Sequence, residues 1–151
     1  MKTLIIGYGN DSRRDDGVGH FVIQQLAQQD LPAGVDLETA HQLEVELSET
    51  LTGYDRAIFV DAAIPEAPAA IQRTVVTPEF KSHAVAHYLT PADVLSLCRT
   101  LYRHEPEAAL FSIRGQDFNF GMELSPAVEQ AGREVVRQIV AMCAANEMTY
   151  A

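Results

Sequence analysis

The chain is poor in basic residues and in cysteine. It carries 11 lysines and arginines against 21 aspartates and glutamates, for a formal net charge of −10. Because nucleic-acid-binding surfaces are basic, this balance excludes a nucleic-acid partner. The two cysteines, Cys98 and Cys143, lie in helix-like segments among apolar neighbours. That setting is typical of buried free thiols, and no pattern indicates a disulfide framework or a zinc site.

Long hydrophobic runs are also missing. Apolar stretches such as LIIG and AIFV are far too short to span a bilayer, so we expect no membrane partner. The N-terminal MKTLIIGYGN turns to glycine and charge too soon for a secretory signal peptide, which predicts a cytoplasmic protein. The chain has no repeats or linkers, and 47% of its 151 residues are hydrophobic, so we expect one domain over residues 1–151. We also expect a monomer.

Strand-like and helix-like segments alternate along the chain. Apolar runs and alternating patterns predict strands over residues 2–6, 35–40, 56–60, 71–77 and 108–113. Apolar residues at helical spacing predict helices over residues 16–28, 42–51, 91–102 and 126–146. Thr90, Pro91 and Asp93 form a helix-start pattern with a capping box. The alternation predicts an α/β fold, a three-layer sandwich with a central, mostly parallel twisted sheet flanked by helices.

The glycine-rich turn GYGNDSRRDDGVG joins the first strand to the first helix. A dinucleotide fingerprint would need a third glycine after Gly7 and Gly9, but Ser12 stands in that place. The turn is also acidic, and carboxylates at a helix N-terminus repel a pyrophosphate. The phosphate-binding motif G-x-x-x-x-G-K-[ST] is missing too. Charge and spacing together exclude a nucleotide site.

Aspartates stand at the strand ends where open parallel sheets bind ligands. Asp61 directly follows the apolar run AIFV, and a carboxylate there is unfavourable unless it lies in a cleft or is paired. This placement favours a functional role for Asp61. Asp15 is predicted to cap the first helix. Asp16 fits either a site residue or a first-turn charge that complements the helix dipole.

Histidines supply a third class of candidate. His87 lies in a loop just before the helix that Thr90 begins. Together with Asp16 and Asp61 it offers two carboxylates and an imidazole, which can hold a divalent metal or position a hydrolytic water. We expect His20 to face solvent, because it lies roughly opposite the apolar stripe of its helix. His41 follows a strand on the same sheet edge and is placed to reach the cleft.

Taken together, these motifs resemble those of the nickel–iron hydrogenase maturation endopeptidases. The family opens with G-x-G-N followed by an acidic pair and x-x-G, and the chain reads GYGNDSRRDDGVG. The strand-end aspartate of AIFVDAA, the histidine of HYLTPADVL and the segment ELSPAVEQA match further family features in the same order. The resemblance spans nearly the whole chain.

The resemblance implies a peptidase that removes the C-terminal extension of a nickel–iron hydrogenase large-subunit precursor after nickel insertion. It implies that Asp16, Asp61 and His87 contact the metal, and that the two aspartates are catalytic in an aspartic-type endopeptidase. The nickel is expected to arrive with the substrate rather than to be a permanent cofactor. Arg13 and Arg14 are either solvated or in contact with the acidic or C-terminal part of the substrate.

Two departures from the family pattern bear on specificity. Asp16 stands where the family often has glutamate. Where many members have a D-G-G-T-x-G loop, this chain reads Glu38-Thr39-Ala40-His41-Gln42-Leu43, and some members share the H-Q-L. The second departure indicates a subfamily difference in substrate recognition and makes His41 a secondary site candidate. Two alternative functions remain open, namely a small-substrate hydrolase with its own metal ion and a non-catalytic chaperone that checks nickel loading.

Overall fold

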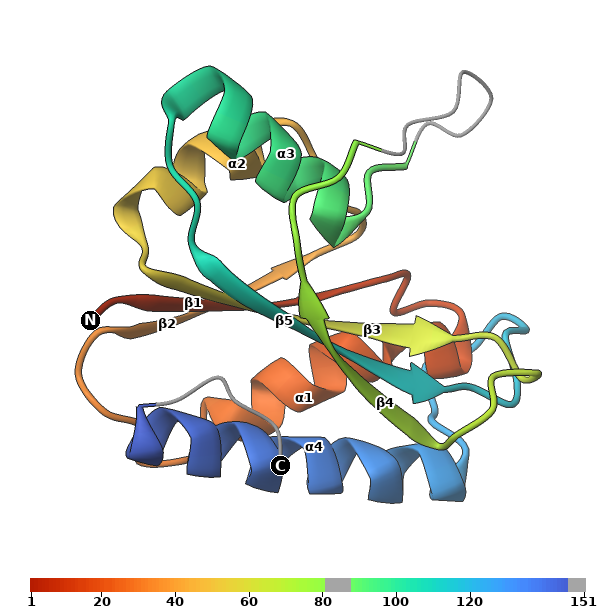
Figure 1. The fold of residues 1–151 in the computed structure, drawn as a ribbon. Helices are drawn as coiled ribbons and strands as arrows, with labels where there is room; N and C mark the ends of the chain where they lie inside the picture. Colours follow the sequence, from red (N-terminus) through yellow and green to blue (C-terminus); the bar gives the residue numbers. More distant parts are fainter. Residues whose placement is uncertain (81–87, 147–151) are drawn as a thin grey trace.

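A five-stranded sheet forms the middle layer of the computed structural model, which describes residues 1–80 and 88–146 (Figure 1). The strands are β1 (Thr3–Tyr8), β2 (Val35–Ala40), β3 (Arg56–Ala63), β4 (Ile71–Val76) and β5 (Glu107–Arg114). Their order across the sheet is β2-β1-β3-β5-β4. All neighbours are parallel except β4, which runs antiparallel to β5 at one edge. The mostly parallel sheet is therefore confirmed.

Helices cover both faces of the sheet (Figure 1). Helices α1 (Val18–Leu26) and α4 (Pro126–Ala145) lie on one face, and α2 (Glu46–Thr50) and α3 (Pro91–Tyr102) lie on the other. The short 3₁₀ helices η1 (Arg14–Gly17) and η2 (Leu51–Gly53) adjoin α1 and α2. The predicted three-layer α/β sandwich is confirmed. None of the described helices is both long and apolar enough to cross a membrane.

The sheet separates two apolar cores. Ile5 of β1 packs in the core beneath α1 and α4, whereas its neighbours Leu4 and Ile6 pack in the core beneath α2 and α3. Successive side chains of a strand point to opposite faces, so a strand covered on both sides is apolar throughout. Cys98 and Cys143 are buried free thiols, one in each core, as predicted.

Two helices begin later than their sequence pattern predicts. Helix α1 starts at Val18 rather than at Asp16, because residues 14–17 form η1 and the acidic side chains of that turn bind other segments. Helix α2 starts at Glu46 rather than at Gln42, because Gln42 and Leu43 instead line a cleft. By contrast, the capping box of Thr90 and Asp93 is present as predicted.

Two glycines set how closely α1 approaches β1. A Cβ atom on Gly7 would lie 2.2 Å from the carbonyl oxygen of Gly19, so only glycine fits there. This contact places the N-terminal end of α1 beside the carboxyl end of β1. Residues 9–17, which we call the site loop, therefore lie at the carboxyl edge of the sheet, where parallel folds bind their ligands.

Candidate active site

An open cleft of about 310 Å³ lies at the carboxyl edge of the sheet. Its walls come from the end of β1 and the site loop, the segment after β2, the end of β3 and the residues just before α3. The lining side chains include Tyr8, Arg13, Asp16, His41 and Asp61. Asp16 and Asp61, separate in the sequence, thus share one cleft.

Asp61 is held near the end of β3 by two hydroxyl groups. The Tyr8 hydroxyl donates to Oδ2 at 2.9 Å, and the Ser112 hydroxyl donates to Oδ1 at 2.7 Å. Burial raises the pKa of Asp61, the two hydrogen bonds lower it, and the nearby negative Asp16 raises it, so the net direction is upward. Asp61 therefore keeps its proton to higher pH than an ordinary aspartate.

Tyr8 and Ser112 are site residues that sequence reasoning missed. Burial, followed by the proximity of Asp61, raises the pKa of Tyr8 well above its usual value, so Tyr8 stays protonated and donates. Ser112 lies directly opposite Asp61 in the register of β3 and β5. The sequence does carry a signal for these two residues, because both are polar and stand near the carboxyl ends of β1 and β5. These two strands flank β3, which carries Asp61.

Asp16 faces the same cleft from η1. Its Oδ2 accepts a hydrogen bond from the backbone N–H of Asn10 at 2.8 Å. Its other oxygen receives no hydrogen bond from the described residues and remains available to a ligand. Gly9 makes this turn possible, because it has a φ of +141° and a Cβ atom there would lie 2.2 Å from the Asp16 carbonyl oxygen.

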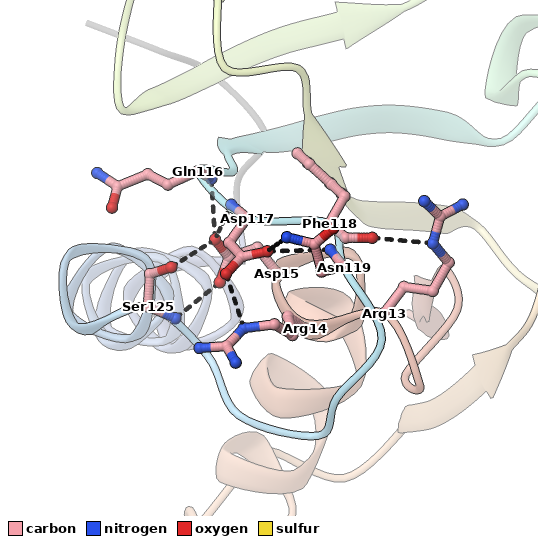
Figure 2. Close-up of polar contacts among 8 residues, drawn as sticks. All are labelled: Arg13, Arg14, Asp15, Gln116, Asp117, Phe118, Asn119 and Ser125. Carbon is pink, nitrogen blue, oxygen red and sulfur yellow. Dashed lines mark hydrogen bonds and ion pairs between the residues drawn. The ribbon is translucent and has the colours of Figure 1, made fainter.

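Asp15 does not cap the first helix, so that prediction is wrong. Its buried carboxylate accepts hydrogen bonds from Gln116 N, Asp117 N, Ser125 N and Ser125 Oγ at 2.7–2.9 Å (Figure 2). Burial acts to raise the pKa of Asp15, but these hydrogen bonds outweigh it and the net direction is downward. Asp15 thus holds the turn in place while its neighbour Asp16 faces the cleft.

The histidines differ in where they lie. His20 was predicted to face solvent, but it is half-buried and its Nε2 donates to the carbonyl oxygen of Gly9 at 2.8 Å. The prediction failed because the site loop folds back over the polar face of α1. His41 is exposed and lines the cleft, as the sequence suggested. The third predicted ligand, His87, lies outside the described residues.

The two arginines of the site loop have separate partners. Arg14 Nε pairs with Asp117 Oδ2 at 3.1 Å, so it is not simply solvated (Figure 2). Arg13 is exposed and lines the cleft, and its Nε donates to the carbonyl oxygen of Phe118 at 3.0 Å (Figure 2). Arg13 therefore brings a positive charge to a cleft that also holds two carboxylates.

The cleft brings together two of the three residues predicted to contact a metal. Asp16 and Asp61 provide carboxylate oxygens, which suit hard and borderline divalent ions. Within residues 1–80 and 88–146, no group of three His, Cys, Asp or Glu side chains is placed to hold an ion. Two carboxylates alone do not make up such a group, and the third predicted contact, His87, lies outside the described residues.

The chain is similar to known hydrogenase maturation proteases in sequence and in fold. No protein-family model matches the chain. The chain is 24% identical over 147 residues to the hydrogenase 2 maturation protease of Escherichia coli (strain K12), covering 93% of this chain and 90% of that protein.

Solved structures share the fold over almost the full length. The hydrogenase maturating endopeptidase HybD from E. coli superposes with a TM-score of 0.79 at 24% identity, over 97% of this chain and 94% of that one. The [NiFe] hydrogenase maturation protease HycI from Thermococcus kodakarensis KOD1 gives a TM-score of 0.74 at 20% identity, over 95% and 92% of the two chains. The chain therefore shares the fold of these solved hydrogenase maturation proteases, and its sequence is similar to one such protease along nearly its whole length.

Proposed function

We propose that the protein is an endopeptidase that removes the C-terminal extension of a nickel–iron hydrogenase large-subunit precursor after nickel insertion. One observation carries this proposal: Asp16 and Asp61 meet in one open cleft of a chain that is similar along its length to a hydrogenase maturation protease. We expect the reaction to take place in the cytoplasm, with the precursor as the protein partner.

We propose different roles for Asp16 and Asp61 because the environments of their carboxylates differ. Asp16 has an oxygen free of donors among the described residues, so it is suited to accept a proton from the attacking water. Asp61 is half-buried, and its raised pKa shows that the protein alone stabilises the ionised carboxylate poorly. A proton or an incoming cation would relieve that cost. Tyr8 and Ser112 fix the orientation of Asp61.

Nickel enters this proposal as part of the substrate. Asp16, Asp61 and His87 are the proposed contacts to the ion that the loaded precursor carries. A divalent ion beside the scissile bond supplies polarisation of the peptide carbonyl. Because the precursor brings the ion, the cleft distinguishes loaded from unloaded precursor through these contacts.

The test is to incubate the protein with nickel-loaded and nickel-free precursor and to measure the mass of the precursor by mass spectrometry. We expect only the loaded precursor to lose its C-terminal extension. A loaded precursor that stays uncut would overturn the proposed function.

Variants of the same assay test the site. Asp16→Ala, Asp61→Ala and His87→Ala should each abolish cleavage while the circular dichroism stays native. Asp30→Ala is the matched control, because Asp30 is exposed and lies beyond the end of α1. Unchanged cleavage by all three site variants would remove the proposed site.

A further inference from the structure

The connection between β5 and α4 is fastened to the site loop. We call residues 116–124 the rim loop. The carboxylate of Asp15 accepts hydrogen bonds from Gln116 and Asp117 at the start of the rim loop and from Ser125 just after its end (Figure 2). One buried side chain of the site loop therefore closes the rim loop at its base.

The middle of the rim loop is fixed as well. Gly121 makes two backbone hydrogen bonds with the site loop, accepting from Arg14 N at 2.8 Å and donating to the Ser12 carbonyl at 2.9 Å. The side chain of Arg13 donates to Phe118 O, and Arg14 pairs with Asp117 (Figure 2). The rim loop is thus held against the segment that carries Asp16, and a surface fixed in advance loses less conformational entropy on binding.

This fixed loop exposes large apolar side chains. Phe120 is 87% exposed and Met122 is 74% exposed, the highest values among large hydrophobic residues in the described part of the chain. Phe118 instead packs over Gly115, where a Cβ atom would lie 2.4 Å from the Phe118 ring. Phe118 is therefore a packing residue of the loop, whereas the side chains of Phe120 and Met122 are mostly exposed.

A second hollow lies beside the rim loop. It measures about 210 Å³, and Met122 and Leu124 line it together with Phe21 of α1 and Arg14 of the site loop. Arg13 and Asp16 line the cleft, whereas Arg14 and Gly17 line this hollow, so the site loop is the wall between the two. One path out of the cleft for a protein whose end lies in it runs over this wall and the rim loop.

We propose that Phe120 and Met122 form the docking surface for the folded body of the hydrogenase large-subunit precursor while its C-terminal segment lies in the cleft. This inference rests on the proposed function. Exposed aromatic and methionine side chains are enriched where proteins associate, and aromatic anchors carry much of the binding energy. Since the rim loop is fastened to the site loop, docking there places the substrate at a set distance from Asp16.

The experiment compares steady-state cleavage of nickel-loaded precursor by wild-type protein and by the double variant F120S/M122S. We expect KM to rise by about tenfold or more, the effect of losing a central apolar anchor, with kcat unchanged. The conservative variant F120Y/M122L should keep the wild-type KM. Leu101→Ser is the matched control, because Leu101 is 57% exposed near the end of α3, on the side where β5 begins.

A second measurement needs no variant. Oxidation of Met122 by dilute hydrogen peroxide, followed by mass spectrometry, should slow when the precursor is bound. The exposed Met1 serves as internal reference, since it lies at the opposite end of β1 from the cleft.

The outcomes separate the two proposals. Wild-type protein that fails to cut the loaded precursor would overturn the proposed function and the docking surface with it. Wild-type cleavage with the KM of F120S/M122S within about twofold of wild type would overturn the docking surface alone. An equal rise in KM for Leu101→Ser would also overturn it, because the effect would then not belong to the rim loop.

Discussion

Neighbouring residues of one type take different roles in the site loop. The Asp15 carboxylate is buried and saturated by donors from the other end of the chain, whereas the Asp16 carboxylate faces the cleft with one oxygen free of described donors. Asp61, a third carboxylate, is held by two hydroxyl groups. The hydrogen bonds each receives and the degree of burial, not the residue type, set the chemistry available to each carboxylate.

Asp61→Asn should abolish cleavage while the fold keeps its stability. The pKa of Asp61 is raised in the folded state, so the protonated side chain stabilises the fold. This stabilisation is fully present below the unfolded pKa of about 3.9 and is lost as pH rises through the folded pKa. At pH 7 the ionised carboxylate thus destabilises the fold, and the neutral asparagine removes that destabilisation. Thermal unfolding should show a Tm at or above wild type at pH 7, with no such advantage near pH 4.

Two results with Asp61→Asn would contradict this prediction. Retained cleavage would exclude Asp61 from the chemistry. A clear fall in Tm at pH 7 would show instead that the ionised carboxylate stabilises the fold through Tyr8 and Ser112.

Asp15→Asn should destabilise the protein by about 2–4 kcal/mol, because an amide group would face backbone N–H donors that need an acceptor. The pKa of Asp15 is lowered, so its contribution is fully present above the unfolded value of about 3.9 and is lost as pH falls through the folded pKa. Urea unfolding at pH 7 and pH 3 measures the difference from wild type, which should shrink at pH 3.

Asp30→Asn is the control for this substitution, since Asp30 is exposed. It should change the free energy of unfolding by less than about 0.5 kcal/mol. A difference between Asp15→Asn and wild type that stays constant down to pH 3 would contradict the assigned pKa direction.

At the scale of elements, the position of α1 decides where the cleft forms. Its first turn meets the end of β1 through Gly7 and Gly19, and a Cβ atom on Gly19 would lie 2.7 Å from Val60 O and 2.8 Å from Tyr8 N. His20 then ties the same helix to Gly9. The close packing of a helix on a strand therefore sets where the site loop lies.

Gly19→Ala should reduce both stability and cleavage. The added methyl group meets backbone atoms that cannot move aside, so we expect a loss of about 2 kcal/mol or more and a lower kcat as α1 shifts. Gly53→Ala is the control, because a Cβ atom there meets nothing within 4 Å and should change stability by less than about 0.5 kcal/mol. If Gly19→Ala and Gly53→Ala lower the free energy of unfolding equally in urea, the close contact between α1 and β1 does not explain the loss.

At the scale of the whole molecule, the layers were predictable and the long-range polar contacts were not. Apolar periodicity located the strands and helices, and the rule for parallel sheets put Asp16 and Asp61 at one edge. The partners of Asp15 lie more than 100 residues away in a segment without apolar periodicity, so no local pattern reveals them. His20 was misplaced for a similar reason, since helical spacing does not show that a loop covers the polar face.

The charge of the whole molecule suits a substrate-borne cation. The chain has a net charge of −10, and two of its carboxylates line the cleft. An acidic surface attracts cations but holds them tightly only where enough ligands converge. Among the described residues, the cleft offers two carboxylates and no group of three ligands.

Under the proposal that nickel belongs to the substrate, removal of metal from the isolated protein should leave its activity intact. Protein treated with a chelator and then desalted should cut nickel-loaded precursor at the rate of untreated protein, because the proposed source of the ion is the precursor itself. Equilibrium dialysis at micromolar nickel should find less than one ion retained per chain. If the chelated protein is inactive until nickel is restored, with the precursor's own nickel unchanged, the metal is a resident cofactor and the protein is a metal-dependent hydrolase instead.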